Sequence, residues 1–210
     1  MQLPFSHEQF LAVFAAYNRA WWPIVVLLWL ASAAALWLTW RRVSKARDQL
    51  APLLAFHWAW AGVVYHFGFF RSINPAATLF GALFVIEACL LLWFGLRRSL
   101  TFRFSRSVWS KLGGALMAYA LVYPFVALAT GLRYPAAPMF GVPCPTAIFT
   151  AGALLLVPRR TARVLSPIVL VWTVTAGSAA FVLGIRPDLM LPVAGLVLLA
   201  YVVTRGPHGL

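Results

Sequence analysis

The sequence has few charged residues, and very few of them are acidic. Asp, Glu, Lys and Arg make up 10% of its 210 residues, and only 4 residues are Asp or Glu. A soluble domain carries about 25% charged residues on average, so this chain has too little charge to cover a water-facing surface. The composition therefore excludes an ordinary soluble globular protein.

Cysteine and lysine are also scarce, which excludes two further classes of protein. The 2 cysteines, Cys89 and Cys144, give no disulfide framework of the kind found in small secreted domains. The only lysines, Lys45 and Lys111, lie outside the long apolar runs. A retinal Schiff base within a bundle of membrane helices is therefore excluded.

The 4 histidines are too dispersed to form a metal or haem centre. His57 and His66 are nine residues apart, which on a helix is about 13.5 Å of rise and half a turn of rotation. His7 and His208 lie at opposite ends of the chain. We therefore expect no metal and no cofactor within one subunit.

Apolar residues are abundant, at 63% of the chain, and they gather in long runs. A helix of about 20 apolar residues crosses a bilayer core of about 30 Å, and the run from Trp21 to Trp40 carries no charge. The pattern predicts one all-α integral membrane domain over residues 1–210, embedded in the lipid bilayer. Its seven transmembrane helices are expected at about 24–40, 51–70, 76–96, 113–132, 146–157 (longer if a kink carries it further), 164–183 and 189–204.

A short amphipathic segment, residues 3–20, precedes the first span. Ser6 and Gln9 match a capping box, and Phe5 and Phe10 lie where a hydrophobic staple would close over it. We expect an interfacial helix that lies on the membrane, with Pro23 separating it from the first span.

The net charge of +13 follows from basic residues that lie between the apolar runs rather than along one face. We interpret them as topology signals, and we expect no binding to nucleic acid. On one side of the predicted membrane fall thirteen of the seventeen Lys and Arg, namely Arg41, Arg42, Lys45, Arg47, Arg97, Arg98, Arg103, Arg106, Lys111, Arg159, Arg160, Arg163 and Arg205. The positive-inside rule then predicts an external N-terminus and a cytoplasmic C-terminus. The segment 100–112, which mixes aromatic and basic residues, is expected along the cytoplasmic interface.

Two polar residues fall near the middle of predicted spans. Counted from the turn near Ile73, His57 and Glu87 are at similar depth in the second and third spans. A carboxylate in hydrocarbon is costly unless it is paired, protonated or hydrated. We therefore predict a buried His57–Glu87 hydrogen bond, which is either a structural tie or part of a proton-accepting or cation-binding site.

The segment from Arg133 to Thr146 is apolar and contains four prolines, so it cannot form a regular helix. The run after it, residues 146–157, spans roughly 18 Å, short of the ~30 Å of a bilayer core. Either this helix continues, kinked, through Pro158, or it starts below the outer surface after a loop that dips inward. In the second case Pro145 suits the first helical position and Cys144 the cap, and free N–H groups at 144–147 would form a site for an anion or polar ligand. The alternative is a rigid external lid that only packs on the bundle.

Several further polar residues gather on the same predicted outer side, near the ends of the spans. Together with the features above they give a set of candidate ligand-binding residues: His57, His66, Arg71, Asn74, Glu87, Arg133, Tyr134, Cys144 and Thr146. Each of them has a structural alternative, such as an anchor for a helix end.

Four segments resemble an uncharacterised bacterial membrane family, domain of unknown function 6064. They are Tyr17-Asn-Arg-Ala-Trp-Trp-Pro23, Trp58-Ala-Trp-Ala-Gly-Val-Val-Tyr-His66, Ile73-Asn-Pro-Ala-Ala77 with Phe80-Gly81, and Phe140-Gly-Val-Pro-Cys-Pro-Thr-Ala-Ile-Phe-Thr150. The resemblance covers most of the first 155 residues. The family often has a histidine where this chain has Leu132. The resemblance implies a multi-pass protein of the bacterial cytoplasmic (inner) membrane and names no reaction.

The function expected from these features is binding or transport of a small polar or anionic ligand or ion. The site would open to the outer face between spans 2, 3 and 5. An alternative is a membrane enzyme with Cys144 as an outer-face thiol and His66 as its base, which requires the two side chains to lie within hydrogen-bond reach. A structural subunit without a ligand is the third possibility, and we expect binding or transport rather than catalysis.

Overall fold

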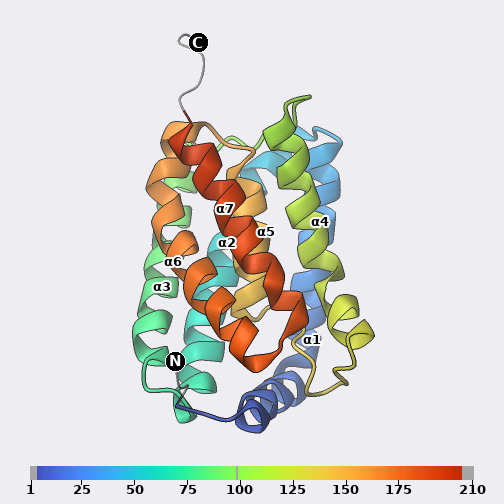
Figure 1. Ribbon diagram of the computed structural model, residues 1–210. Coiled ribbons are helices and arrows are strands. Elements are labelled where there is room, and N and C mark those ends of the chain that lie inside the picture. The colour runs from blue at the N-terminus through green and yellow to red at the C-terminus, as the bar shows by residue number, and fades with distance from the viewer. Residues whose placement is uncertain (1–3, 98, 205–210) are drawn as a thin grey trace.

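The apolar runs fold as a bundle of helices, shown in Figure 1. The computed structural model describes residues 4–97 and 99–204, without the side chains of 44–48. Within this part of the chain every regular element is helical: α1 His7–Trp40, α2 Ser44–Trp60, α3 Ala77–Leu96, α4 Val108–Ala129, α5 Pro143–Leu154, α6 Arg159–Leu183 and α7 Met190–Val203, with the π-helix η1 Ala61–Phe67 and the 3-10 helices η2 Phe70–Ser72 and η3 Arg186–Leu189. Leu3, Arg98, Arg205 and His208, which the predictions included, lie outside the described residues.

Six helical segments of the described chain are long and apolar enough to cross a membrane. Their outer faces carry large apolar side chains, such as Leu96, Val174 and Phe181, which are 74%, 70% and 68% exposed. Such faces suit lipid rather than water. The prediction of an all-α protein with membrane-spanning helices is confirmed to this extent, and α5 is too short to belong to the six.

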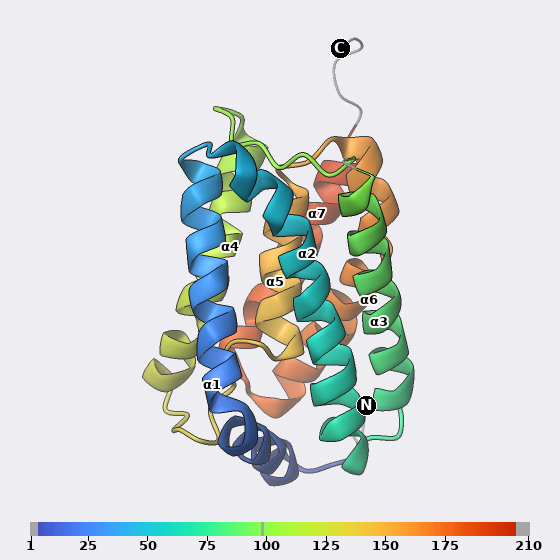
Figure 2. The ribbon, with the colours of Figure 1, turned by 180° about the vertical axis from the view of Figure 1, so that it is seen from behind.

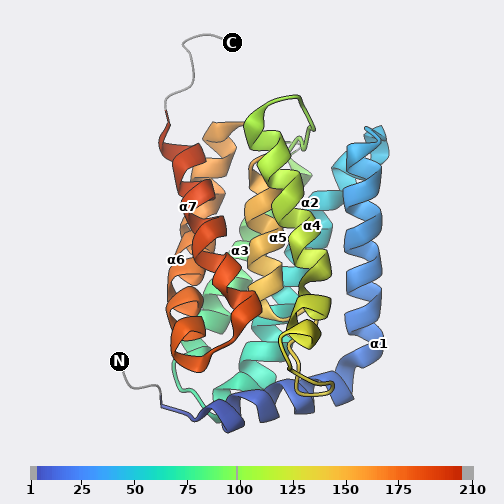
Figure 3. The ribbon, with the colours of Figure 1, turned by 45° about the vertical axis from the view of Figure 1, so that its right-hand side comes forward.

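The first helix is a single element, so the predicted boundary at Pro23 is wrong. α1 runs from His7 to Trp40 with Pro23 inside it. Figure 3 shows its first part lying across one end of the bundle and the rest running along the bundle's side. Proline removes one helical hydrogen bond and bends a helix without ending it where the flanking turns hold.

The start of α1 is formed as its sequence predicts. The Ser6 hydroxyl accepts a hydrogen bond from the backbone N–H of Gln9, and the Gln9 side chain accepts one from the backbone N–H of Ser6. The rings of Phe5 and Phe10 stack, with centroids 5.6 Å apart. The capping box and the hydrophobic staple are both confirmed.

The short helix α5 lies at the centre of the bundle, where Figures 1 and 2 show it between the other helices. All of its residues, from Pro143 to Leu154, are buried. It packs most closely on α4, where a Cβ built on Gly152 would lie 2.6 Å from the carbonyl oxygen of Gly113. Close approach of helix backbones at small residues is common in membrane bundles.

Irregular chain covers both ends of α5. At the lid end, which we define as the first part of α1 with residues 68–76, 130–142 and 184–189, the loop buries Ala137, Phe140 and Val142. The helix ends at Leu154, and Pro158 is the N-cap of α6. The loop before α5 thus dips inward among the helices of the bundle, and the alternative of a helix continuing through Pro158 is wrong. Non-helical backbone is tolerated at such depth because protein surrounds it.

At the opposite end, which we call the basic end (residues 41–43, 97–107 and 155–158), another irregular segment covers α5. Leu100 and Phe102 are buried, and the Arg103 N–H donates to the carbonyl oxygen of Leu156, 2.9 Å away. The segment predicted along the membrane interface therefore packs inward over its first part. Only from Val108 does it continue as helix α4.

Candidate functional site

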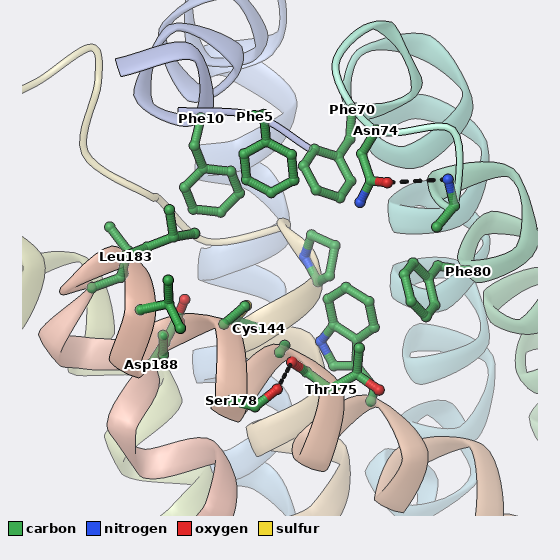
Figure 4. A pocket seen from close by; sticks show the side chains of 18 of the residues that line it. Phe5, Phe10, Phe70, Asn74, Phe80, Cys144, Thr175, Ser178, Leu183 and Asp188 are labelled. Carbon is green, nitrogen blue, oxygen red and sulfur yellow. Dashed lines mark hydrogen bonds between the residues drawn. The ribbon is translucent and has the colours of Figure 1, made fainter. Parts of the chain in front are cut away.

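A cavity of about 300 Å³ lies at the lid end, shown in Figure 4. Its walls come from the first part of α1, from η1, η2 and the start of α3, from the start of α5, from the last turns of α6 and from η3. Most of the lining is aromatic or aliphatic, with Phe5, Phe10, Phe14, Phe70, Phe80 and Trp172 contributing rings. The cavity is thus mainly apolar, as small-molecule sites generally are.

The aromatic wall follows from the helical spacing of phenylalanine in α1. Phe10 and Phe14 are one turn apart, and their rings meet edge to face with centroids 4.8 Å apart. Phe5 meets Phe70 of η2 in the same way, at 5.4 Å. Phe10 meets Phe70 as well, at 5.8 Å, so these contacts hold the first part of α1 against η2, where it covers the cavity.

One wall of the cavity carries a buried carboxyl group. Asp188 lies in η3 and is only 3% exposed. The hydroxyl of Tyr123, from α4, donates a short hydrogen bond to its Oδ1. The side chain of Cys144, at the start of α5, lines the same cavity. Figure 4 shows Asp188 and Cys144 on the same side of the cavity.

The start of α5 differs from its prediction by two residues. Val142 is the N-cap and Pro143 the first helical residue, so Cys144 is not the cap. Pro143 and Pro145 have no N–H, and the Thr146 N–H donates to the carbonyl oxygen of Val142, 3.4 Å away. Cys144 is therefore the only one of the first three helical residues with an N–H to offer. The predicted group of free donors for an anion is not formed.

His66 lies behind the aromatic wall, in the π-helix that continues α2. Its ring meets those of Phe84 and Trp172, with centroids 4.9 Å and 5.1 Å away. Neither ring nitrogen has a hydrogen-bond partner among the described residues. The predicted hydrogen bond between His66 and the Cys144 thiol is therefore absent. Single turns of π-helix occur often at functional sites, and nothing in the sequence pattern indicated this one.

The predicted His57–Glu87 hydrogen bond is also absent. His57 Nε2 lies 2.9 Å from the hydroxyl oxygen of Ser32, in α1. Glu87 is fully buried in α3, and neither of its carboxyl oxygens has a partner among the described residues. The side chain of His57 therefore contacts α1, and that of Glu87 has no polar neighbour in the described part of the chain.

The other predicted site residues divide between the cavity and the surface. Asn74 and Cys144 line the cavity. Arg71, Arg133 and Tyr134 are exposed at the lid end. The buried hydroxyl of Thr146 has no partner in the described part of the chain. Sequence reasoning missed Asp188, one of only 4 acidic residues, because its turn after the sixth span resembles an ordinary external loop.

Hydrogen bonds tie the first part of α1 to the inward-dipping loop. The Asn18 amide donates to the carbonyl oxygens of Pro135 and Ala137, at 2.6 Å and 2.8 Å. The Tyr17 hydroxyl donates to the Gly141 carbonyl oxygen at 3.2 Å. It accepts from Trp60 Nε1 at 2.7 Å. Three of the four segments that carry the family resemblance therefore meet at the lid end.

Replacing Tyr17 with phenylalanine is expected to lower the free energy of unfolding by about 2 kcal/mol, because it leaves the Trp60 N–H and the Gly141 carbonyl without a partner. In a chain of this length the melting temperature should fall by about 4–8 °C. Tyr134→Phe is the control, since Tyr134 is 54% exposed and should melt like the wild type. Equal melting temperatures for both variants in dodecyl maltoside would contradict the role of Tyr17.

Three comparisons with known proteins bear on the identity of the chain. The model of a family of unknown function, DUF6064, matches residues 7–207, so the chain belongs to that family and the resemblance is confirmed. No curated protein and no solved structure matches the chain. The chemistry of the site has therefore to be argued from its own residues.

Proposed function

We propose that this member of the family is a multi-pass protein of the bacterial cytoplasmic membrane that binds a small, mainly apolar ligand carrying an amine or another hydrogen-bond donor. The observation that carries the proposal is the buried carboxyl group of Asp188 in the wall of an otherwise apolar, largely aromatic cavity. Ionisable groups inside membrane bundles are costly and tend to serve function.

The distribution of basic residues supports the orientation. Thirteen of the seventeen Lys and Arg fall on one side in the sequence prediction, and those of them that the structure describes include Arg42, Arg97 and Arg106 at the basic end. The positive-inside rule assigns this side to the cytoplasm. The lid end then faces outside. The short helix α5 lies between the six segments that are long enough to cross the membrane. In this orientation the ligand reaches the cavity from the outer side.

The lining of the cavity favours a ligand with a hydrogen-bond donor over the anionic ligand that the sequence analysis considered. No lysine or arginine belongs to the lining among the described residues. A bound anion would meet the Asp188 carboxyl without a compensating cation, whereas an ammonium group would pair with it. The faces of Trp172 and the phenylalanines would attract the same cation. The apolar part of the ligand would lie against these rings.

Binding is better supported than catalysis or a purely structural role. A thiol enzyme needs an imidazole beside its thiol, and neither ring nitrogen of His66 has a hydrogen-bond partner among the described residues. A structural subunit without a ligand would have no reason to keep a carboxyl group in the wall of a cavity. Transport by the same protein would require a second opening toward the basic end, so we limit the proposal to binding.

Three probes with the same phenylethyl body test the proposal: 2-phenylethylamine, 2-phenylethanol and phenylacetate. We expect the amine to raise the melting temperature most and the carboxylate least. The alcohol also donates a hydrogen bond to the carboxyl group, so the amine gains only the added attraction between charges. A charged hydrogen bond contributes about 1–1.5 kcal/mol more than a neutral one, so the amine should bind roughly 10-fold more tightly than the alcohol. Unfolding is measured by the fluorescence of the 10 tryptophans.

Asp188→Asn should remove the preference for the amine while leaving the apolar contacts. Glu8→Gln is the matched control, because Glu8 is an exposed carboxylate in the first turn of α1 and its loss should leave the order of the probes unchanged. An amine preference that persists in Asp188→Asn, or equal shifts for all three probes in the wild type, would falsify the proposal.

A further inference from the structure

A second concave region lies at the basic end, between α1 and α4. It is an open groove of about 620 Å³. Ala33 and Leu36 of α1 and Gly114 of α4 form its apolar part, and Arg42, Arg106 and Lys111 add positive charge. None of these residues belongs to the lining of the cavity at the lid end.

The groove follows from how α1 and α4 meet. Nearer the middle of the bundle they are joined, because Trp29 Nε1 donates to the Leu121 carbonyl oxygen at 2.7 Å and the Trp29 ring meets Phe125. Toward the basic end small residues line both sides. A Cβ built on Gly114 would lie 3.0 Å from the ring of Phe104, so glycine leaves room for that ring at the floor of the groove.

The groove combines the features of a membrane interface. Trp37 and Trp40 line it and are 56% and 63% exposed, and tryptophan prefers the level of the lipid headgroups. Arg106 and Lys111 are exposed. No carboxylate belongs to the described lining. The charge is therefore positive at headgroup level, above an apolar part that reaches between two helices.

We propose that this groove binds an anionic phospholipid, with its phosphate near Arg106 and Lys111 and an acyl chain along Ala33, Leu36 and Gly114. Basic pockets between membrane helices are known to bind anionic headgroups. The occupant follows from charge complementarity together with the apolar part of the groove, which a free anion would not use. The inference concerns α1 and α4 at the basic end, so it stands or falls independently of the ligand proposed for the lid end.

The test compares palmitoyl-oleoyl phosphatidylglycerol with phosphatidylcholine of the same chains. Each is added to the full chain purified in dodecyl maltoside, and retained lipid is measured by native mass spectrometry. Each basic residue at a membrane surface contributes about fivefold in affinity for an anionic lipid. Arg106 and Lys111 together should therefore make phosphatidylglycerol bind about 25-fold more tightly than phosphatidylcholine, and Arg106→Gln with Lys111→Gln should remove most of this preference, leaving only the share of Arg42.

Arg97→Gln with Arg160→Gln is the matched control. It removes the same charge at the same end, outside the lining of the groove, and should keep the lipid preference. Gly114→Leu, which fills the apolar part but keeps the charges, should weaken binding of both lipids. If both double variants lose the preference for phosphatidylglycerol to the same extent, the preference comes from net charge alone and the proposal is overturned. Equal competition by inorganic phosphate at the lipid's concentration would overturn the acyl-chain contact.

Discussion

Replacing Gly152 with leucine is expected to unfold the contact between α4 and α5, and with it much of the bundle. A Cβ at this position would lie 2.6 Å from the carbonyl oxygen of Gly113 and 3.0 Å from the backbone nitrogen of Met117. Both neighbours are backbone atoms of α4, so no side-chain rotation relieves the overlap. Overpacking a well-packed core costs typically 1–3 kcal/mol and sometimes more, and a whole leucine side chain should cost about 4 kcal/mol or more.

The measurement is the yield of monodisperse protein in dodecyl maltoside and its melting temperature. Gly68→Leu is the matched control, because Gly68 is exposed and the nearest atom to a Cβ there is 3.8 Å away. The control should melt within about 2 °C of the wild type, since exposed substitutions change stability by about 0.5 kcal/mol. If Gly152→Leu melts as the control does, α4 and α5 do not pack at the described distance.

The short length of the fifth apolar run predicted part of the structure of α5. Twelve residues are too few to cross a bilayer, which already indicated a loop that dips inward or a kinked continuation. The choice between them depended on Pro158, which is the N-cap of α6. A proline suits either a kink or a helix start, so the local sequence did not distinguish the two. The capping box at Ser6 was predictable because its two partners are three residues apart.

The partners of the buried polar groups could not be predicted in the same way. Counting residues predicts the depth of a residue along its span, which is how His57 and Glu87 were expected to meet. Which side of each helix faces which neighbour depends on the rotation of the helix and on the packing order of the bundle. Ser32, the hydrogen-bond partner of His57, lies in α1, and no counting from the turn between spans two and three includes that helix.

The candidate site lies elsewhere than the sequence predicted, again because packing decides which side chains face inward. The sequence places several polar residues at the predicted outer end, but Arg71, Arg133 and Tyr134 are exposed there. Asp188 is drawn into the cavity wall because η3 turns inward and Tyr119 holds the carbonyl oxygen of Pro187 at 2.9 Å. An external turn that folds inward has no signature in hydropathy. The combination of a rare carboxylate with a neighbouring proline is the only signal that pointed to it.

Replacing Glu87 with methionine is expected to raise the free energy of unfolding. The carboxyl group is fully buried, and its two oxygens have no hydrogen-bond partner among the described residues. Each buried polar atom without a partner costs about 1–3 kcal/mol. Methionine has a similar length and no polar group that requires a partner, so Glu87→Met should gain about 2–4 kcal/mol and melt roughly 4–16 °C higher.

Two controls separate the removal of the carboxyl group from a general effect of methionine. Glu87→Gln keeps two polar atoms at the same place and should gain little. Ile86→Met changes the neighbouring residue, which is 50% exposed, and should melt as the wild type does.

A lower melting temperature for Glu87→Met would mean that the carboxyl group has a favourable partner, and that the Glu87 side chain of α3 points to a different neighbour than described. If Glu87→Met is more stable and still binds 2-phenylethylamine, the carboxyl group serves neither the fold nor the cavity. If the same variant no longer binds 2-phenylethylamine, the buried carboxyl group of Glu87 lowers stability but is needed for binding, as is typical of functional sites.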